Sequence, residues 1–326
     1  MRRMRVVGVG LVLLCCVVSP LQAKQLKVLA IGNSFSLSMM EQFPKVAAAY
    51  PGCELDVVNL YIAGCPLDKH WRNIEIGRTN ALLRPYSVRA SYTFDKKKMP
   101  KWANIPEMLA TDRWDVVTIQ QSSGKSAFAE TYQPYADKLI GEIRRLAPQA
   151  EIRVHQTWSY SPYDGRLASW KMTPETMYES LRSAYAELAR QYGFKTIPVG
   201  DAVQLYRQRL PVRYGKVLTG KEIRAIERPG RVDFYGDVVG SSSWRKGDKG
   251  TRDGDQVKLR LDRCHLNRRG EYLQACVWLA ALFEVDVTKL AYAPEFKDDH
   301  VEVQLMRTCA NEAVRNQSRN ASEVSR

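Results

Sequence analysis

Between residues 27 and 199 the sequence alternates between short apolar runs and longer segments with polar faces. Helical spacing is clearest at 132–146, where Tyr135, Leu139 and Ile143 share one face, and at 174–192. Strands separated by helices in this way favour a parallel sheet with helices on both faces and right-handed crossovers. The sequence therefore predicts an α/β fold, a three-layer α/β/α sandwich around a five-stranded parallel sheet, with strands at 27–31, 55–62, 114–119, 151–156 and 195–199.

Polar or glycine-containing segments follow each of these runs directly. Because the carboxyl ends of parallel strands lie at one edge of a sheet, ligand sites gather at that edge. We therefore expect a functional site there. The segments are, in chain order, Gly32-Asn33-Ser34, Ala63-Gly64-Cys65, Gln120-Gln121-Ser122, Thr157-Trp158-Ser159-Tyr160 and Gly200-Asp201.

Ser34 stands in a glycine-containing turn between the first strand and the next helix. A serine there has an accessible hydroxyl, and backbone N–H groups of the helix start point towards developing negative charge. That position suits a nucleophile. The alternative is that Ser34 or Ser36 only caps the helix.

Asp262 lies three residues before His265, just ahead of the helix predicted at 269–283. A carboxylate in that position can hold the imidazole in one tautomer, so that the other ring nitrogen takes a proton from a serine. The alternative is a chance Asp-x-x-His beside a helix start.

Taken together, these segments resemble the SGNH hydrolases, also called GDSL-like lipases and esterases. That family carries a Gly-Asp-Ser turn after the first strand, a glycine after the second, an asparagine after the third and an Asp-x-x-His near the C-terminus. Gly32-Asn33-Ser34, Gly64, Gln120-Gln121-Ser122 and Asp262 to His265 occur in that order. The resemblance covers most of residues 25–285, is closest to an exported branch with Gly-Asn-Ser first, and implies a flavodoxin-like sheet of the SGNH type.

The resemblance implies a Ser-His-Asp triad of Ser34, His265 and Asp262. It also implies an oxyanion hole formed by the backbone N–H groups of Ser34 and Gly64 and by an amide from the third segment. We favour Gln121 over Gln120 or Ser122 for that amide, because glutamine is a donor like asparagine with one more methylene. Asn33 replaces the usual Asp, a change expected to matter little.

Four further residues are candidates for substrate contacts. His70 and Trp71 follow Gly64 closely, with a packed loop as the alternative. Trp158 and Tyr160 follow the fourth strand, where aromatic faces suit a sugar ring or merely cover the core. His155 lies on that strand itself, so we predict a hydrogen-bonded core histidine.

Residues 1–23 are predicted to be a secretory signal peptide. Arg2, Arg3 and Arg5 precede an apolar run at 6–18, shorter than the about 20 residues of a membrane-spanning helix. An uncleaved anchor is the alternative. The mature protein is therefore expected to be exported, periplasmic or extracellular, without a membrane span. We predict one hydrolase domain at 24–310, with a basic excursion at 211–261, and a polar tail at 311–326.

Charge and cysteine content narrow the expected partners. Loss of three arginines with the signal lowers the formal net charge from +14 to +11, which is compatible with an anionic substrate. Five cysteines remain, and a disulfide between Cys65 and Cys264 is one hypothesis. No Cys-x-x-Cys pair occurs, so we expect no metal and no cofactor. Nucleic acid is not an expected partner.

The sequence thus predicts an exported serine esterase that hydrolyses an acyl ester, expected to be acetyl, on a carbohydrate or another small ester. A carbohydrate O-acyltransferase with the same triad is one alternative, since the acyl group can pass to a sugar hydroxyl instead of water. A catalytically silent glycan-binding protein is the other.

Overall fold

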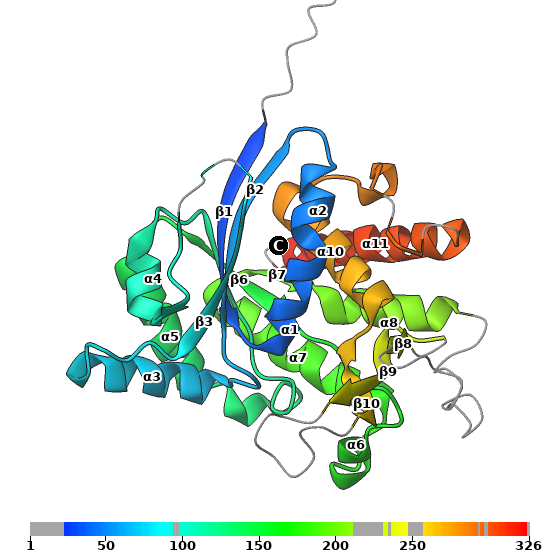
Figure 1. Ribbon diagram of the computed structural model, residues 1–326, viewed down its shortest axis with the longest axis horizontal. Helices are drawn as coiled ribbons and strands as arrows, with labels where there is room; N and C mark the ends of the chain where they lie inside the picture. The colour runs from blue at the N-terminus through cyan, green and yellow to red at the C-terminus, as the bar shows by residue number, and fades with distance from the viewer. Residues whose placement is uncertain are drawn as a thin grey trace, which may run out of the picture.

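The computed structural model describes residues 23–93, 95, 98–210, 231–233, 236–246, 257–292, 294–296 and 299–324. Its main sheet has seven strands in the order β4-β3-β2-β1-β5-β6-β7, and it runs through the middle of the molecule (Figure 1). The strands are β1 (Lys24–Gly32), β2 (Cys53–Tyr61), β3 (Tyr86–Tyr92), β4 (Trp102–Ala103), β5 (Val116–Ile119), β6 (Glu151–Gln156) and β7 (Lys195–Pro198).

The predicted parallel sheet is confirmed. Strands β2, β1, β5, β6 and β7 pair in parallel in that order, which is the flavodoxin-like order 2-1-3-4-5. The sheet has two more strands than predicted, because β3 and β4 extend it in antiparallel pairing beyond β2. Residues 86–92 and 102–103 are thus part of the main sheet.

Helices cover both faces of this sheet, as predicted. Helices α3 (Leu67–Thr79), α4 (Ile105–Thr111), α5 (Tyr135–Leu146) and α7 (Pro174–Tyr192) form one layer. Helices α2 (Phe43–Ala48), α8 (Val199–Arg209), α10 (Arg268–Phe283) and α11 (His300–Val324) form the other. In Figure 1, α3, α4 and α5 lie to the left of the sheet, and α2, α10 and α11 lie to its right. The short helices are α1 (Ser34–Leu37), η1 (Ser38–Glu41), η2 (Ala129–Thr131), α6 (Gly165–Ser169) and η3 (Val287–Lys289).

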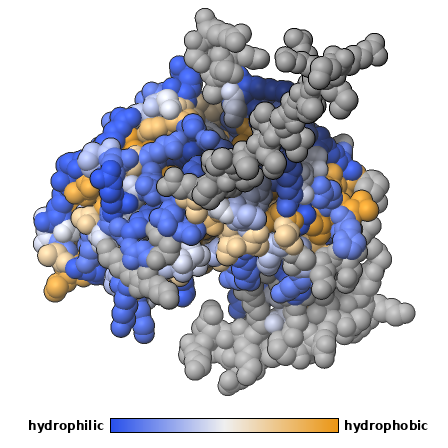
Figure 2. Space-filling model, turned by 90° about the horizontal axis from the view of Figure 1, so that it is seen from above, coloured by the Kyte–Doolittle hydropathy of each residue, from blue (hydrophilic) through white to orange (hydrophobic). Residues whose placement is uncertain are grey.

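The local sequence explains these elements. Residues 28–32 of β1 are buried, as expected of a central parallel strand covered on both faces. Thr173 and Thr176 form a capping box at the start of α7, and Gly193 ends that helix in the left-handed conformation. Helix α10 is buried along most of its length and forms the centre of its layer. Hydrophilic residues cover most of the described surface in the view of Figure 2.

A second, antiparallel sheet lies within the predicted excursion at 211–261. It has the order β10-β9-β8, with β8 at Arg231–Asp233, β9 at Val239–Lys246 and β10 at Val257–Leu266. Residues 211–230 and 247–256 lie outside the described residues. The pairing of β10 with β9 shifts register between Asp262 and Leu266, and this irregular stretch carries the Asp-x-x-His motif.

The C-terminal segment differs from the prediction. The helix at α10 is not the last one, and residues 311–324 continue α11 instead of forming a polar tail. Ala310 and Ala313 are buried, and the Gln317 side chain donates a hydrogen bond to Asp201 (2.7 Å). Residues 311–324 are polar in composition, yet an apolar face of α11 and the Gln317–Asp201 hydrogen bond hold this segment against α8.

No helix in the described part of the chain combines the length and the apolarity needed to cross a membrane. The predicted signal peptide lies outside the described residues up to position 22.

Candidate active site

Three predicted residues meet at the carboxyl edge of the main sheet, although Ser34 and His265 are 231 positions apart in the chain. The Ser34 Oγ atom lies 2.8 Å from His265 Nε2. The other ring nitrogen, Nδ1, lies 2.8 Å from Asp262 Oδ2. Asp262 Oδ1 accepts hydrogen bonds from the backbone N–H groups of Cys264 (3.1 Å) and His265 (3.0 Å). The carboxylate is thus held in place while its second oxygen orients the imidazole.

The electrostatics of this pair favour an ionised Asp262. Burial raises the pKa of the Asp262 carboxyl, but the hydrogen bond and charge of His265, with the two backbone N–H groups, hold that pKa well below its usual range. Burial alone lowers the pKa of His265. Hydrogen bonds to Asp262 and Cys264 outweigh burial and raise that pKa. A carboxylate that stabilises the imidazolium suits a histidine that takes up a proton during a reaction.

Asn33, not Ser34, caps the helix that follows the nucleophile turn. Its Oδ1 atom accepts a hydrogen bond from the backbone N–H of Phe35 (3.0 Å). The Ser34 hydroxyl is therefore available to His265. The turn leaves no space for a side chain at Gly32. A Cβ atom there would lie 2.3 Å from Ser36 Oγ and 3.1 Å from Gln120 Cδ.

The Asn33 side chain also joins the ends of three strands. Its Nδ2 donates to the backbone carbonyl of Cys65 after β2 (3.1 Å), and its Oδ1 accepts from Gln120 Nε2 after β5 (2.8 Å). The side chain is 1% exposed. An aspartate has no hydrogen to give to the Cys65 carbonyl, so the Asn in place of Asp has a structural role that the sequence did not reveal.

His155 extends this hydrogen-bonded network from Gln120 to Gln274. The prediction that His155 is a hydrogen-bonded core histidine is confirmed. Its Nδ1 lies 2.5 Å from Gln120 Oε1, and its Nε2 lies 3.3 Å from Gln274 Nε2. Because the Gln120 amide already donates to Asn33, its oxygen faces His155 Nδ1, which must carry the hydrogen. Gln274 also donates to the Phe35 carbonyl (2.9 Å). Burial lowers the pKa of His155 to about 3, so the ring is neutral.

Gln121, which the sequence predicts to complete the oxyanion hole, has its side-chain amide bonded to other groups in this structure. Its amide nitrogen is held by the carbonyl oxygen (3.0 Å) and hydroxyl (3.2 Å) of Thr131. Its oxygen accepts from the backbone N–H groups of Leu67 (3.1 Å) and Ser122 (2.9 Å). Gln120 is likewise bound to Asn33 and His155. Both side chains therefore take part in hydrogen bonds that join the strand ends.

The four residues predicted to contact the substrate are all buried in this structure. His70, Trp158 and Tyr160 are fully buried, and Trp71 is 9% exposed. His70 stacks on Tyr86 and lies 2.9 Å from its hydroxyl. The guanidinium of Arg78 lies over the Trp71 ring, and that of Arg166 lies over the Tyr160 ring. Such packed rings form the walls of loops and not a substrate surface.

Trp158 nevertheless supports the site from below. Its ring stacks on Phe35, the neighbour of Ser34, with centroids 4.0 Å apart and an interplanar angle of 4°. Its indole Nε1 donates to the backbone carbonyl of Cys264, the neighbour of His265 (2.9 Å). One buried side chain thus fixes the serine turn relative to the histidine strand. Its place at a strand end was the only sequence signal for this role.

Comparison with known proteins adds the family. The model described as "Domain of unknown function (DUF4886)" matches residues 27–210. The chain belongs to this family. A crystal structure of a DUF4886 family protein from Bacteroides uniformis ATCC 8492 is 27% identical, covers 89% of this chain and 95% of that chain, and has a TM-score of 0.67. The family match includes Ser34, Gly64 and Gln120, whereas Asp262 and His265 lie beyond its end.

Other solved structures are more distant from this DUF4886 protein. A protein from Slackia heliotrinireducens, provisionally described as an SGNH hydrolase, is 18% identical, with 79% of this chain and 100% of that chain covered and a TM-score of 0.45. The family 3 carbohydrate esterase of Clostridium thermocellum is 13% identical, with 80% and 96% covered and a TM-score of 0.40. No curated protein matches the chain.

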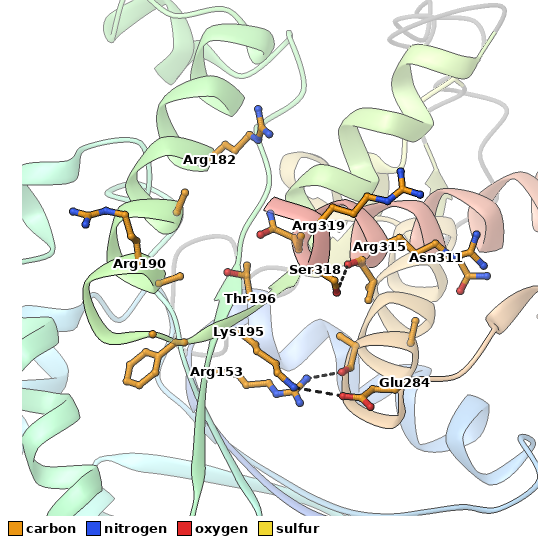
Figure 3. A pocket seen from close by; sticks show the side chains of 18 of the residues that line it. Arg153, Arg182, Arg190, Lys195, Thr196, Glu284, Asn311, Arg315, Ser318 and Arg319 are labelled. Carbon is orange, nitrogen blue, oxygen red and sulfur yellow. Dashed lines mark hydrogen bonds and ion pairs between the residues drawn. The ribbon is translucent and has the colours of Figure 1, made fainter. Parts of the chain in front are cut away.

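A large cavity among the described residues of this DUF4886 protein lies away from the triad. It measures about 1340 Å³ and is lined by residues of α7, β7, α10 and α11. Figure 3 shows Arg182 and Arg190 on α7, Lys195 at the start of β7, and Arg315 and Arg319 on α11 around it. Because Lys195 begins its strand, this cavity, the amino-edge groove, lies at the opposite edge of the sheet from Ser34.

Proposed function

We propose that this protein is an exported serine esterase that hydrolyses an acyl ester, expected to be acetyl, on a carbohydrate. The observation that carries the proposal is the continuous hydrogen-bonded chain from Ser34 Oγ through His265 to Asp262. Each of the three groups has the partner that its role requires: a nucleophile next to a base, and a base next to an ionised carboxylate.

In the acylation step the Ser34 oxygen attacks the ester carbonyl while His265 Nε2 takes up the hydroxyl proton. Asp262 holds the hydrogen on Nδ1, so that Nε2 presents a lone pair to the serine, and it stabilises the imidazolium that forms. His265 then gives this proton to the leaving alcohol. In the second step His265 activates a water molecule, which attacks the acyl-enzyme and releases the acid.

Backbone N–H groups are the proposed donors to the oxyanion. Ser34 is the first residue of α1, and N–H groups in the first turn of a helix have no partner within that helix. Gly64 follows β2 in an exposed turn with a φ of +57°, and the Asn33–Cys65 hydrogen bond ties that turn to the serine turn. Gln120 and Gln121 hold the two turns together without contacting the oxyanion.

Substrate class and export rest on the sequence. The aromatic residues that suggested a sugar ring are buried, so the carbohydrate part of the proposal depends on the SGNH resemblance and on the predicted signal peptide. The net charge of the mature chain favours an anionic ester, for which turnover at low substrate concentration should fall as salt is added.

Hydrolysis of p-nitrophenyl acetate by the purified protein tests the proposal. Ser34→Ala and His265→Ala should each lower kcat by at least about 10³-fold, because either change removes a group that acts in both steps. Ser36→Ala is the matched control: its hydroxyl lies in the same turn but bonds to the Asn33 carbonyl, so activity should stay within a few-fold of wild type.

Wild-type activity no greater than that of Ser34→Ala would overturn the esterase proposal and leave glycan binding. Faster release of p-nitrophenol when a sugar is added, with acylated sugar as a product, would replace hydrolase by acyltransferase.

A further inference from the structure

Cys264 places a third potential metal ligand beside the Asp262–His265 pair. Its Sγ lies 3.5 Å from His265 Nδ1 and 3.7 Å from Asp262 Oδ1. One ligand atom from each of the three side chains lies within 4.8 Å of the other two. All five described cysteines are free thiols, and the other four are buried, whereas Cys264 is half-buried. The hypothesis of a Cys65–Cys264 disulfide therefore does not hold in this structure.

The irregular end of β10 explains this clustering. In a regular strand, neighbouring side chains point to opposite faces, so Cys264 and His265 would diverge. The register shift between Asp262 and Leu266 interrupts that alternation. Asp262 also accepts hydrogen bonds from the backbone N–H groups of Cys264 and His265. These bonds fold the strand end around the carboxylate and bring the three side chains together.

The distances match the edges of a zinc tetrahedron. With Zn–S of about 2.3 Å and Zn–N or Zn–O of about 2.0–2.2 Å, a tetrahedral ion sets sulfur about 3.6 Å from nitrogen or oxygen, and nitrogen about 3.4 Å from oxygen. The distances from Cys264 Sγ to His265 Nδ1 (3.5 Å) and to Asp262 Oδ1 (3.7 Å) are close to these edges. The other carboxylate oxygen, Oδ2, lies 2.8 Å from Nδ1 around a hydrogen. An ion that replaces this hydrogen therefore requires the carboxylate to shift, so that the one oxygen that binds the ion lies at the tetrahedral distance from both sulfur and nitrogen.

We propose that Asp262, Cys264 and His265 form an inhibitory site for Zn²⁺ that switches off the triad. A metal bound to Nδ1 leaves the ring hydrogen on Nε2, the nitrogen that faces Ser34 Oγ. His265 then donates to the serine and cannot remove its proton. Asp262 is withdrawn at the same time from its hydrogen bond to the imidazole. The ion enters as an inhibitor, and the reaction itself uses no metal.

Access and ligand number support this site. The side chains of His265 and Asp262 are 40% and 31% exposed, so an ion can reach them from solvent. Three protein ligands leave a fourth position for water, and the set of thiolate, imidazole and carboxylate suits Zn²⁺ better than Mg²⁺ or Ca²⁺. Metal binding at this site does not depend on the proposed function. Inhibition by the bound metal does rest on the proposed function.

Direct binding tests the site without any activity. Calorimetry with Zn²⁺, and the thiolate-to-metal absorption of bound Co²⁺, should show one site in the wild type and equally in Ser34→Ala. Cys264→Ser should weaken binding at least about tenfold and abolish the thiolate band. Cys53→Ser removes a buried thiol elsewhere and should leave both readouts unchanged. Binding that is unaffected by Cys264→Ser would overturn the site.

Inhibition is tested on the same proteins with p-nitrophenyl acetate. Zn²⁺ should abolish wild-type turnover, and excess EDTA should restore it. With inhibition expressed relative to the zinc-free activity of each protein, Cys264→Ser should need at least about tenfold more Zn²⁺ for half-inhibition than the wild type. Equal sensitivity of Cys264→Ser and wild type would overturn the switch. If Cys264-dependent binding is observed but no variant hydrolyses the ester, the metal site stands and the proposed function fails.

Discussion

The two edges of the main sheet differ in what they do with polar side chains. At the carboxyl edge, Ser34, His265 and Asp262 form one directed chain of hydrogen bonds supported from below by Asn33 and Trp158. At the amino edge, a cavity of about 1340 Å³ is lined by charged residues that pair with their neighbours, such as Lys195 with Glu284 at 3.5 Å.

The physical reason lies in how each edge is built. At the carboxyl ends of β1, β2, β5 and β6, buried amides and an imidazole are joined by hydrogen bonds from Cys65 through Asn33 and Gln120 to His155. Exposed ion pairs at the amino edge are worth about 0–1 kcal/mol each and are easily replaced by water. A matched buried network positions a nucleophile, whereas a set of surface ion pairs does not.

Asp262→Asn should give the largest effect. The side-chain oxygen of the introduced asparagine would still accept hydrogen bonds from the backbone N–H groups of Cys264 and His265. Its NH₂ group would therefore face His265 Nδ1. That nitrogen would become an acceptor, the hydrogen would move to Nε2, and kcat should fall about 10⁴-fold. The measurement is ester turnover, with thermal unfolding as the control for folding. A loss below tenfold would contradict the role of Asp262.

Asn33→Asp tests the network beneath the serine. A carboxylate would face the Cys65 carbonyl where the amide now donates, in a site that is 1% exposed. The free energy of unfolding should fall by about 1–3 kcal/mol, measured by urea denaturation. Ser36→Ala serves as the matched change in the same turn. An unchanged free energy of unfolding would mean that the hydrogen bond from Asn33 to the Cys65 carbonyl does not stabilise the fold.

The two fully buried histidines predict an acid-sensitive fold. Burial lowers the pKa of both His70 and His155 to about 3, from an ordinary value near 6.5. Between these values the unfolded chain binds protons that the folded chain excludes, so stability is full above pH 6.5 and falls as the pH drops towards 3. Each histidine contributes up to about 1.4 kcal/mol per pH unit. Urea denaturation from pH 7 to pH 4 measures the slope, and His155→Gln should reduce it by about one proton. The same slope in the variant would contradict the neutral state of His155.

Glu284→Gln at the amino edge should have the smallest effect. It breaks the exposed pair with Lys195, so the free energy of unfolding should change by less than about 0.5 kcal/mol and ester turnover by less than about twofold. A tenfold loss of turnover would show that the amino-edge groove is coupled to the triad and would erase the contrast between the two edges.

Much of this protein could be predicted from the sequence alone. The parallel sheet, α5, α7 and the carboxyl-edge location of the site follow from apolar runs and helical spacing, which are local properties of the chain. The meeting of Ser34 with Asp262 and His265 followed from the order of motifs at strand ends. Helix α3 and the helical course of residues 311–324 were missed, because their apolar faces are narrow and interrupted by charged residues.

Only the tertiary structure decided which polar group bonds to which. Gln121 resembles an oxyanion donor in sequence, yet Thr131, ten residues later, takes its amide. Trp158 resembles a sugar platform, yet its ring and its N–H are used by Phe35 and by Cys264, 106 residues away. A hydrogen bond depends on distance and direction between segments brought together by folding. Residue type determines which bonds are possible, and the packing of distant segments determines which of them form.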